Sequence, residues 1–133
     1  MMQILNQKEV DIMGTWAEGN FDNDGALDYL AGIIDQITSN IEDIFNSGDA
    51  ADLEQCGESE LMPGFEIISI LSEKCNAVPP KEDTVNRWKN KYLKIYDSQI
   101  DGLNPDADYK IKRRKVIEDT FNKLLEKSKD FWK

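Results

Sequence analysis

Apolar residues that recur at steps of three and four positions dominate this chain and restrict it to packed helices. The clearest run lies between Asp24 and Phe45. Its apolar members are Ala26, Leu27, Leu30, Ile33, Ile34, Ile37, Ile41, Ile44 and Phe45. This spacing places them on one face of an α-helix and places Asp24, Asp28, Asp35 and Glu42 on the opposite face. Because the polar residues 22–24 can cap free backbone N–H groups, the sequence predicts a helix over residues 24–45.

The same periodicity predicts three further helices, over residues 63–75, 82–100 and 105 to the C-terminus. Pro79 and Pro80 separate the second and third helices, because consecutive prolines cannot continue a helix. Asn104 and Pro105 are predicted to be the N-cap and first residue of the fourth helix. We expect Phe131 and Trp132 to lie on the inner face of that helix.

The segment between residues 49 and 63 has a weak pattern. It predicts a short acidic helix or loop near Ala50–Gln55, broken at Gly57. The whole pattern is typical of an all-α fold, a compact bundle of about four main amphipathic helices. A segment that contains Gly14 and Gly19 precedes the bundle. We expect Trp88 of the third helix to belong to its core.

The chain has 133 residues, the size of one domain. We interpret residues 13–133 as a single helical domain and residues 1–12 as an N-terminal extension. The sequence holds neither an apolar run of bilayer-spanning length nor the basic and apolar regions of a signal peptide. A cytoplasmic protein without membrane contact is therefore expected, with Cys56 and Cys75 as free thiols.

Charge is distributed unevenly along the chain. Residues 1–80 hold sixteen acidic and two basic residues, whereas residues 81–133 hold ten acidic and fourteen basic residues. No basic residue lies between Lys8 and Lys74. Either the basic helices pack beside the acidic half and partly neutralise it, or an exposed acidic face meets a cationic partner.

One stretch follows the first half of a calcium-binding loop. The oxygen ligands would be Asn20, Asp22, Asp24 and Asp28, with Gly25 at the sixth position. The twelfth position of such a loop holds a bidentate glutamate, and here it is Ala31. The pattern therefore favours an acidic helix cap over a metal site.

Catalytic motifs are missing from the sequence. The chain has no histidine, which excludes the commonest general base and most zinc sites. We therefore expect no catalytic residues and no cofactor. Glu66, within an apolar stretch, is interpreted as a helix-edge or ion-paired residue, with a special functional role as the alternative. The basic run Lys110–Lys115 favours a solvated face or internal pairing over contact with nucleic acid.

The stretch Met13–Leu30 resembles the opening of a bacterial family of unknown function, number 4259. The residues that carry the resemblance are Trp16, Gly19, Phe21, Asp22, Asn23 and Asp24. Ala17 departs from the glycine that the family often has there. Members usually begin at the methionine that matches Met13. The resemblance implies a small bacterial cytoplasmic domain and implies no activity.

A structural role accounts for these motif residues. Trp16 and Phe21 are expected to plug the end of the bundle, while Gly14 and Gly19 permit tight turns. The residues 22–24 would then satisfy N–H groups at the helix start. A binding site built from the same residues is the alternative.

The combined pattern predicts a non-catalytic protein-interaction module that binds a cationic partner, similar to inhibitor or immunity proteins. Its acidic face would consist of Asp28, Asp35, Glu42, Asp43, Asp49, Asp52 and Glu54. The alternative is a divalent-metal-dependent binding or hydrolytic domain that uses the carboxylates of Asp22, Asp24 and Asp28. Neither nucleic acid nor membrane is an expected partner, and the sequence leaves the oligomeric state open.

Overall fold

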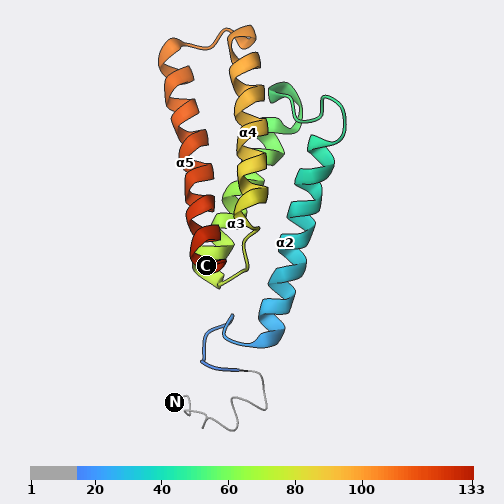
Figure 1. Cartoon of the computed structure of the whole chain (residues 1–133), viewed down its shortest axis with the longest axis vertical. Coiled ribbons are helices and arrows are strands. Elements are labelled where there is room, and N and C mark those ends of the chain that lie inside the picture. The colour runs from blue at the N-terminus through green and yellow to red at the C-terminus, as the bar shows by residue number, and fades with distance from the viewer. Residues whose placement is uncertain (1–14) are drawn as a thin grey trace.

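The computed structural model describes residues 15–133, in which four long α-helices run alternately up and down (Figure 1). They are α2 (Asp24–Phe45), α3 (Met62–Cys75), α4 (Glu82–Gln99) and α5 (Ala107–Phe131). A π-helical segment, η1 (Leu53–Leu61), leads into α3, and a 3-10 turn, η2 (Ile100–Leu103), extends α4. The predicted all-α bundle is confirmed. No helix of the described residues is long and apolar enough to cross a membrane.

The predicted bounds of the first helix are confirmed in α2. The Asn23 side chain caps it by accepting a hydrogen bond from the Ala26 N–H, at 2.8 Å. The buried residues of α2 are Leu30, Ile34, Ile41 and Ile44, all from the predicted apolar face. Gly64 of α3 lies close to Ile37 and Ile41, so α2 packs directly against α3.

The predicted break at Gly57 is wrong, because the helical path bends at Gln55, where φ is −101° and ψ is −117°. Gly57 lies inside the helical segment and is buried. A Cβ atom there would lie 2.6 Å from the Ala51 carbonyl oxygen and 2.9 Å from that of Asp52. The glycine therefore permits the close approach of the preceding turn.

The start of the last helix also differs from the prediction. Asn104 is left-handed, with φ 52° and ψ 51°, and it ends η2. An N-cap residue needs extended backbone angles, and Asp106 has them, with φ −60° and ψ 141°. Consequently α5 begins at Ala107, and Pro105 lies in the connection.

Aromatic rings form the centre of the core. Phe65 of α3 packs on Trp88 and Tyr92 of α4 and on Phe121 of α5, with ring centroids 4.6 to 6.4 Å apart. Trp88 is fully buried, as predicted. Phe131 and Trp132 are not core residues, since 51% and 44% of their surfaces are exposed. Trp132 follows the end of α5, where its indole N–H donates to the Pro79 carbonyl oxygen instead of entering the core.

Candidate functional site

Glu42 joins the acidic helix α2 to the basic helix α4. Its two carboxylate oxygens accept from the Arg87 guanidinium at 2.7 and 3.0 Å, and Oε1 also accepts from the Trp88 indole N–H at 2.6 Å. The hydrogen bond from Arg87 lowers the pKa of Glu42 in spite of partial burial. Glu42 was predicted to belong to the partner-binding face. Its carboxylate instead binds two side chains of α4 within the same molecule.

Glu58 forms a second junction, between η1, α4 and α5. Arg113 donates two hydrogen bonds of 2.9 Å to its carboxylate, and the Tyr92 hydroxyl donates a third. Burial raises the pKa of Glu58, but the bonds from Arg113 and Tyr92 outweigh burial, so the pKa lies below its ordinary value. No local sequence pattern indicates Glu58, because its partner Arg113 lies 55 positions away.

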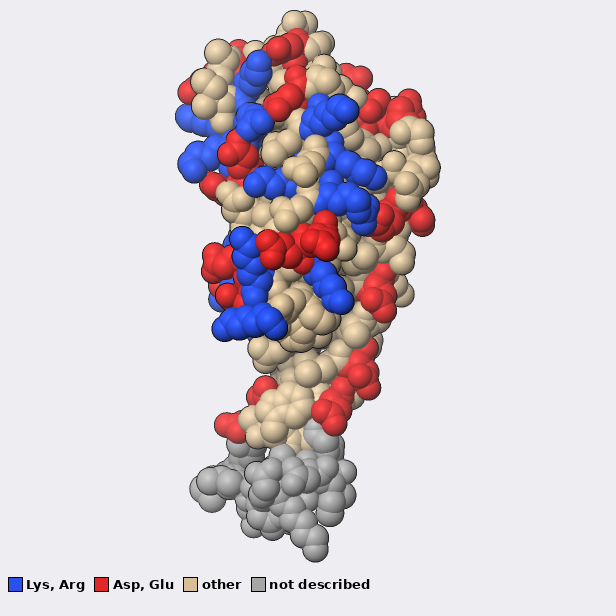
Figure 2. Space-filling model, in the orientation of Figure 1, with Lys and Arg blue, Asp and Glu red and all other residues tan. Residues whose placement is uncertain are grey.

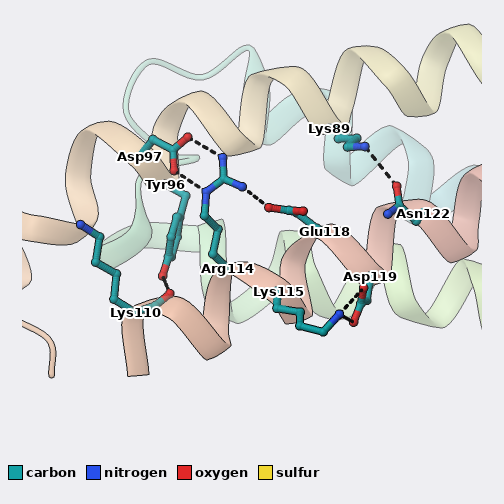
Figure 3. Close-up of polar contacts among 9 residues, drawn as sticks. All are labelled: Lys89, Tyr96, Asp97, Lys110, Arg114, Lys115, Glu118, Asp119 and Asn122. Atoms are coloured by element: carbon teal, nitrogen blue, oxygen red, sulfur yellow. Dashed lines mark hydrogen bonds and ion pairs between the residues drawn. The ribbon is translucent and has the colours of Figure 1, made fainter. Parts of the chain in front are cut away.

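The basic run Lys110–Lys115 is paired along α5 and with the neighbouring helix (Figure 3). Arg114 binds Asp97 of α4 at 2.8 Å and also contacts Glu118. The remaining pairs are Lys110–Asp101, Lys112–Asp108, Arg113–Glu58 and Lys115–Asp119. Among the residues of this run, only Arg113 reaches an acid of the first eighty residues.

Ion pairs between the two halves of the chain are therefore few. Within residues 15–133 they are Glu42–Arg87, Glu58–Arg113 and Glu73–Lys123. The basic helices thus neutralise only a small part of the acidic half. Of the fourteen basic residues of residues 81–133, five pair with acids of that same half, namely Lys110, Lys112, Arg114, Lys115 and Lys129.

Five exposed acids without an ion pair to a described residue lie on α2, on the turn that follows it and at the start of η1. We call them the acidic surface and define it as Asp28, Asp35, Asp43, Asp49 and Glu54, all of which are exposed. None of the five forms an ion pair with another described residue. On the face shown in Figure 2, acidic side chains follow the edge along which α2 runs, whereas lysines and arginines gather over α4 and α5.

Asp52 was predicted to belong to the same face, and its carboxylate also bonds within the molecule. Its carboxylate accepts from the Gln99 amide at 2.7 Å, while the Gln99 carbonyl accepts from the Leu53 N–H at 2.9 Å. These bonds tie the start of η1 to the end of α4. Asp52 is half-buried and lines a cavity at this end of the bundle together with Asp49 and Glu54.

The residues that follow the first half of a calcium loop lie at the start of α2, where the sequence favoured a helix cap. The Gly19 N–H donates to Asp22 Oδ2 at 2.9 Å, Asn23 caps α2, and Asp24 is already the first helical residue. Asn20 and Asp28 are exposed. Within the described part of the chain, no three acidic, cysteine or histidine side chains converge to hold a metal ion.

This geometry also explains part of the motif at residues 16–24. A Cβ atom on Gly19 would lie 2.3 Å from Asp22 Oδ2, so any larger residue there would require the Asp22 side chain to move. Phe21 packs against the core, as expected of a residue that plugs the bundle. The same expectation for Trp16 is wrong, because 48% of its surface is exposed. Gly14 lies outside the described residues.

The structure also places Glu66 and the two cysteines. Glu66 is exposed on α3, and its charge acts on Lys123 of α5. Cys56 and Cys75 are free thiols, as expected.

Comparison with known proteins gives the family of the chain. The model of the family described as "Domain of unknown function (DUF4259)" matches residues 14–132. The chain therefore belongs to this family, as the resemblance of its opening residues indicated. No curated protein and no solved structure is significantly similar to it.

Proposed function

We propose that this DUF4259 protein is a non-catalytic interaction module whose acidic surface binds a cationic protein partner. The observation that supports the proposal most is that the five carboxylates of the acidic surface are exposed and form no ion pair within residues 15–133. Small acidic proteins that neutralise a basic toxin or nuclease follow the same electrostatic logic. The proposal includes a cytoplasmic location, which the two free thiols support.

The arrangement of the acids suits an extended basic surface. Asp28 and Asp35 are seven residues apart, which is about two helical turns and about 10 Å along α2. Asp43, Asp49 and Glu54 continue the charge toward the opposite end of the bundle. A single exposed ion pair contributes roughly 0.5 kcal/mol, so the main effect of such a surface is faster and more selective encounter.

The pKa values of four charged groups that join the helices support a non-catalytic role. Those of Glu42, Glu58, Arg87 and Arg113 are shifted, and each of these groups is engaged in an ion pair between packed helices. Their shifts are accounted for by structural ion pairs, and the chain contains no histidine.

A pull-down from native cells tests the proposal. The bait proteins are the wild type, a variant with Asp28, Asp35 and Asp43 changed to Asn, and a control variant with D83N, E126Q and D130N. The control acids are exposed and form no ion pair with a described residue.

We expect wild type and control to capture the same basic protein at low salt and to release it at high salt. The variant of α2 should capture much less of it. Failure of the wild type to capture any basic protein at low salt, or equal loss by both variants, would contradict the proposal.

A further inference from the structure

Two cavities adjoin at the end of the bundle where η1 meets η2, the upper end in Figure 1. Their volumes are about 550 and 370 Å³. Leu53 and Leu103 line both cavities, which are therefore neighbours, and we call the two together the end groove. Each volume is within the range of ligand pockets, roughly 300 to 1,000 Å³.

The charged residues that line the end groove are all acidic. They are Asp49, Asp52, Glu54, Glu58 and Asp106. Glu58 is neutralised by Arg113, and Asp52 is bonded to Gln99. The other three are exposed and have no ion-pair partner among residues 15–133. The groove therefore attracts cations and repels anions.

Apolar surface forms the rest of the groove. Leu53 and Ile100 are buried in its floor, while 42% of Leu103 and 51% of Tyr109 are exposed. Such exposed apolar side chains beside carboxylates suit a ligand with an apolar stem and a cationic end. Lysine and arginine side chains have this form, and a tyrosine ring can also pack against their cations.

We propose that the end groove takes a lysine or arginine side chain of the partner protein. This inference rests on the proposed function and names the place where the partner is anchored. Asp49 and Glu54 belong both to the acidic surface and to the end groove, so one partner can contact both. The apolar stem would lie on Leu53 and Leu103, and the cation near the exposed carboxylates.

Chemical-shift mapping of the full chain with two short acetylated peptides tests this proposal directly. One peptide has a central lysine and the other has norleucine, which keeps an apolar chain and lacks the charge. We expect the lysine peptide to shift the amide signals of Leu53, Leu103 and Tyr109, and the norleucine peptide to shift them much less. Equal responses to both peptides, or lysine-induced shifts spread evenly over all helices, would overturn the proposal.

Two variants separate the groove from general charge. Leu103→Ser removes an exposed wall of the groove, and Ile67→Ser removes an equally exposed apolar side chain from α3. We expect Leu103→Ser to weaken binding of the lysine peptide about tenfold and Ile67→Ser to leave it unchanged. Equal effects of the two substitutions would overturn the proposal.

The captured partner distinguishes failure of the groove from failure of the proposed function. If Leu103→Ser binds the partner normally while the α2 variant does not, the groove proposal is wrong and the proposed function stands. If neither Leu103→Ser nor the α2 variant loses partner binding, the groove proposal and the proposed function are both wrong. If these two variants lose partner binding while Ile67→Ser retains it, both claims are supported.

Discussion

At the scale of single residues, Glu58 is the acid that connects η1 to both α4 and α5. Its carboxylate receives Arg113 and Tyr92 from two different helices. Burial and the neighbouring Glu58 also raise the pKa of the Tyr92 hydroxyl, which therefore remains a hydrogen-bond donor. Three elements of the bundle thus meet at one charge-assisted contact.

Glu58→Gln removes that charge and is expected to lower the free energy of unfolding by about 2 kcal/mol at neutral pH. The folded-state pKa of Glu58 lies below its ordinary value of 4.5. Its stabilising contribution is therefore present above pH 4.5 and is lost as the pH falls through the lower folded-state value.

Urea denaturation of wild type and Glu58→Gln across this pH range measures the difference. The difference in the free energy of unfolding between the two proteins should become smaller as the pH decreases below 4.5. The variant Glu126→Gln, at an exposed position, is the control. Its free energy of unfolding should differ very little from that of the wild type. A difference for Glu58→Gln that is independent of pH would refute the assignment.

Gly57 and Gly32 provide a second test at this scale. Gly57→Ala would place Cβ against two backbone carbonyl oxygens and should destabilise the fold by roughly 2 kcal/mol. Gly32 lies within α2 with open space around it, so Gly32→Ala should stabilise by roughly 0.8 kcal/mol. Chemical denaturation of both variants measures the two opposite changes. Equal changes would show that the close approach at Gly57 is unimportant.

At the scale of elements, features that depend on neighbouring residues could be predicted from the sequence, whereas contacts between distant residues could not. The bounds of α2 could be predicted because its apolar period and its cap at Asn23 are local. The break predicted at Gly57 lies two residues earlier, at Gln55, because Gly57 itself keeps helical geometry and permits the close approach of the preceding turn. The acidic surface followed from the α2 pattern, whereas the internal use of Glu42 and Asp52 depends on partners more than forty residues away.

The connection between α3 and α4 is held by the C-terminal end of α5. Ser128 donates to the Pro80 carbonyl oxygen at 2.7 Å, and the Trp132 indole donates to that of Pro79 at 2.8 Å. Lys81 lies over the Trp132 ring, 5.0 Å from its centroid. Prolines have no N–H group, so their carbonyls are the backbone polar atoms available to anchor this connection.

Trp132→Phe removes one of these anchors and keeps an aromatic ring. We expect it to lower the free energy of unfolding by about 1 kcal/mol. Hydrogen exchange at the Ala77 N–H, which binds the Leu71 carbonyl oxygen, should become faster. Tyr29→Phe, at a position with 71% exposure, should change neither quantity. Unchanged exchange in Trp132→Phe would show that the indole contact does not hold the connection.

At the scale of the whole molecule, the net charge of −10 is unevenly compensated. Three ion pairs join the acidic and basic halves within the described residues, and the acidic surface takes part in none of them. Like charges that are retained without internal partners reduce the stability of the compact state.

Neutralising Asp28, Asp35 and Asp43 should therefore leave the free protein as stable as the wild type or more stable. The difference should be largest at low salt and decrease as salt screens the repulsion. Thermal unfolding at several salt concentrations measures it. Marked destabilisation of this variant at all salt concentrations would mean that the acids stabilise the fold.

The association rate of the captured partner, measured against salt concentration, tests the central claim most directly. If the acidic surface attracts a cationic partner, the rate for the wild type should fall steeply with salt. The Asp28, Asp35 and Asp43 variant should associate more slowly at low salt and respond less to salt. A rate that is independent of salt and equal in the two proteins would contradict the account.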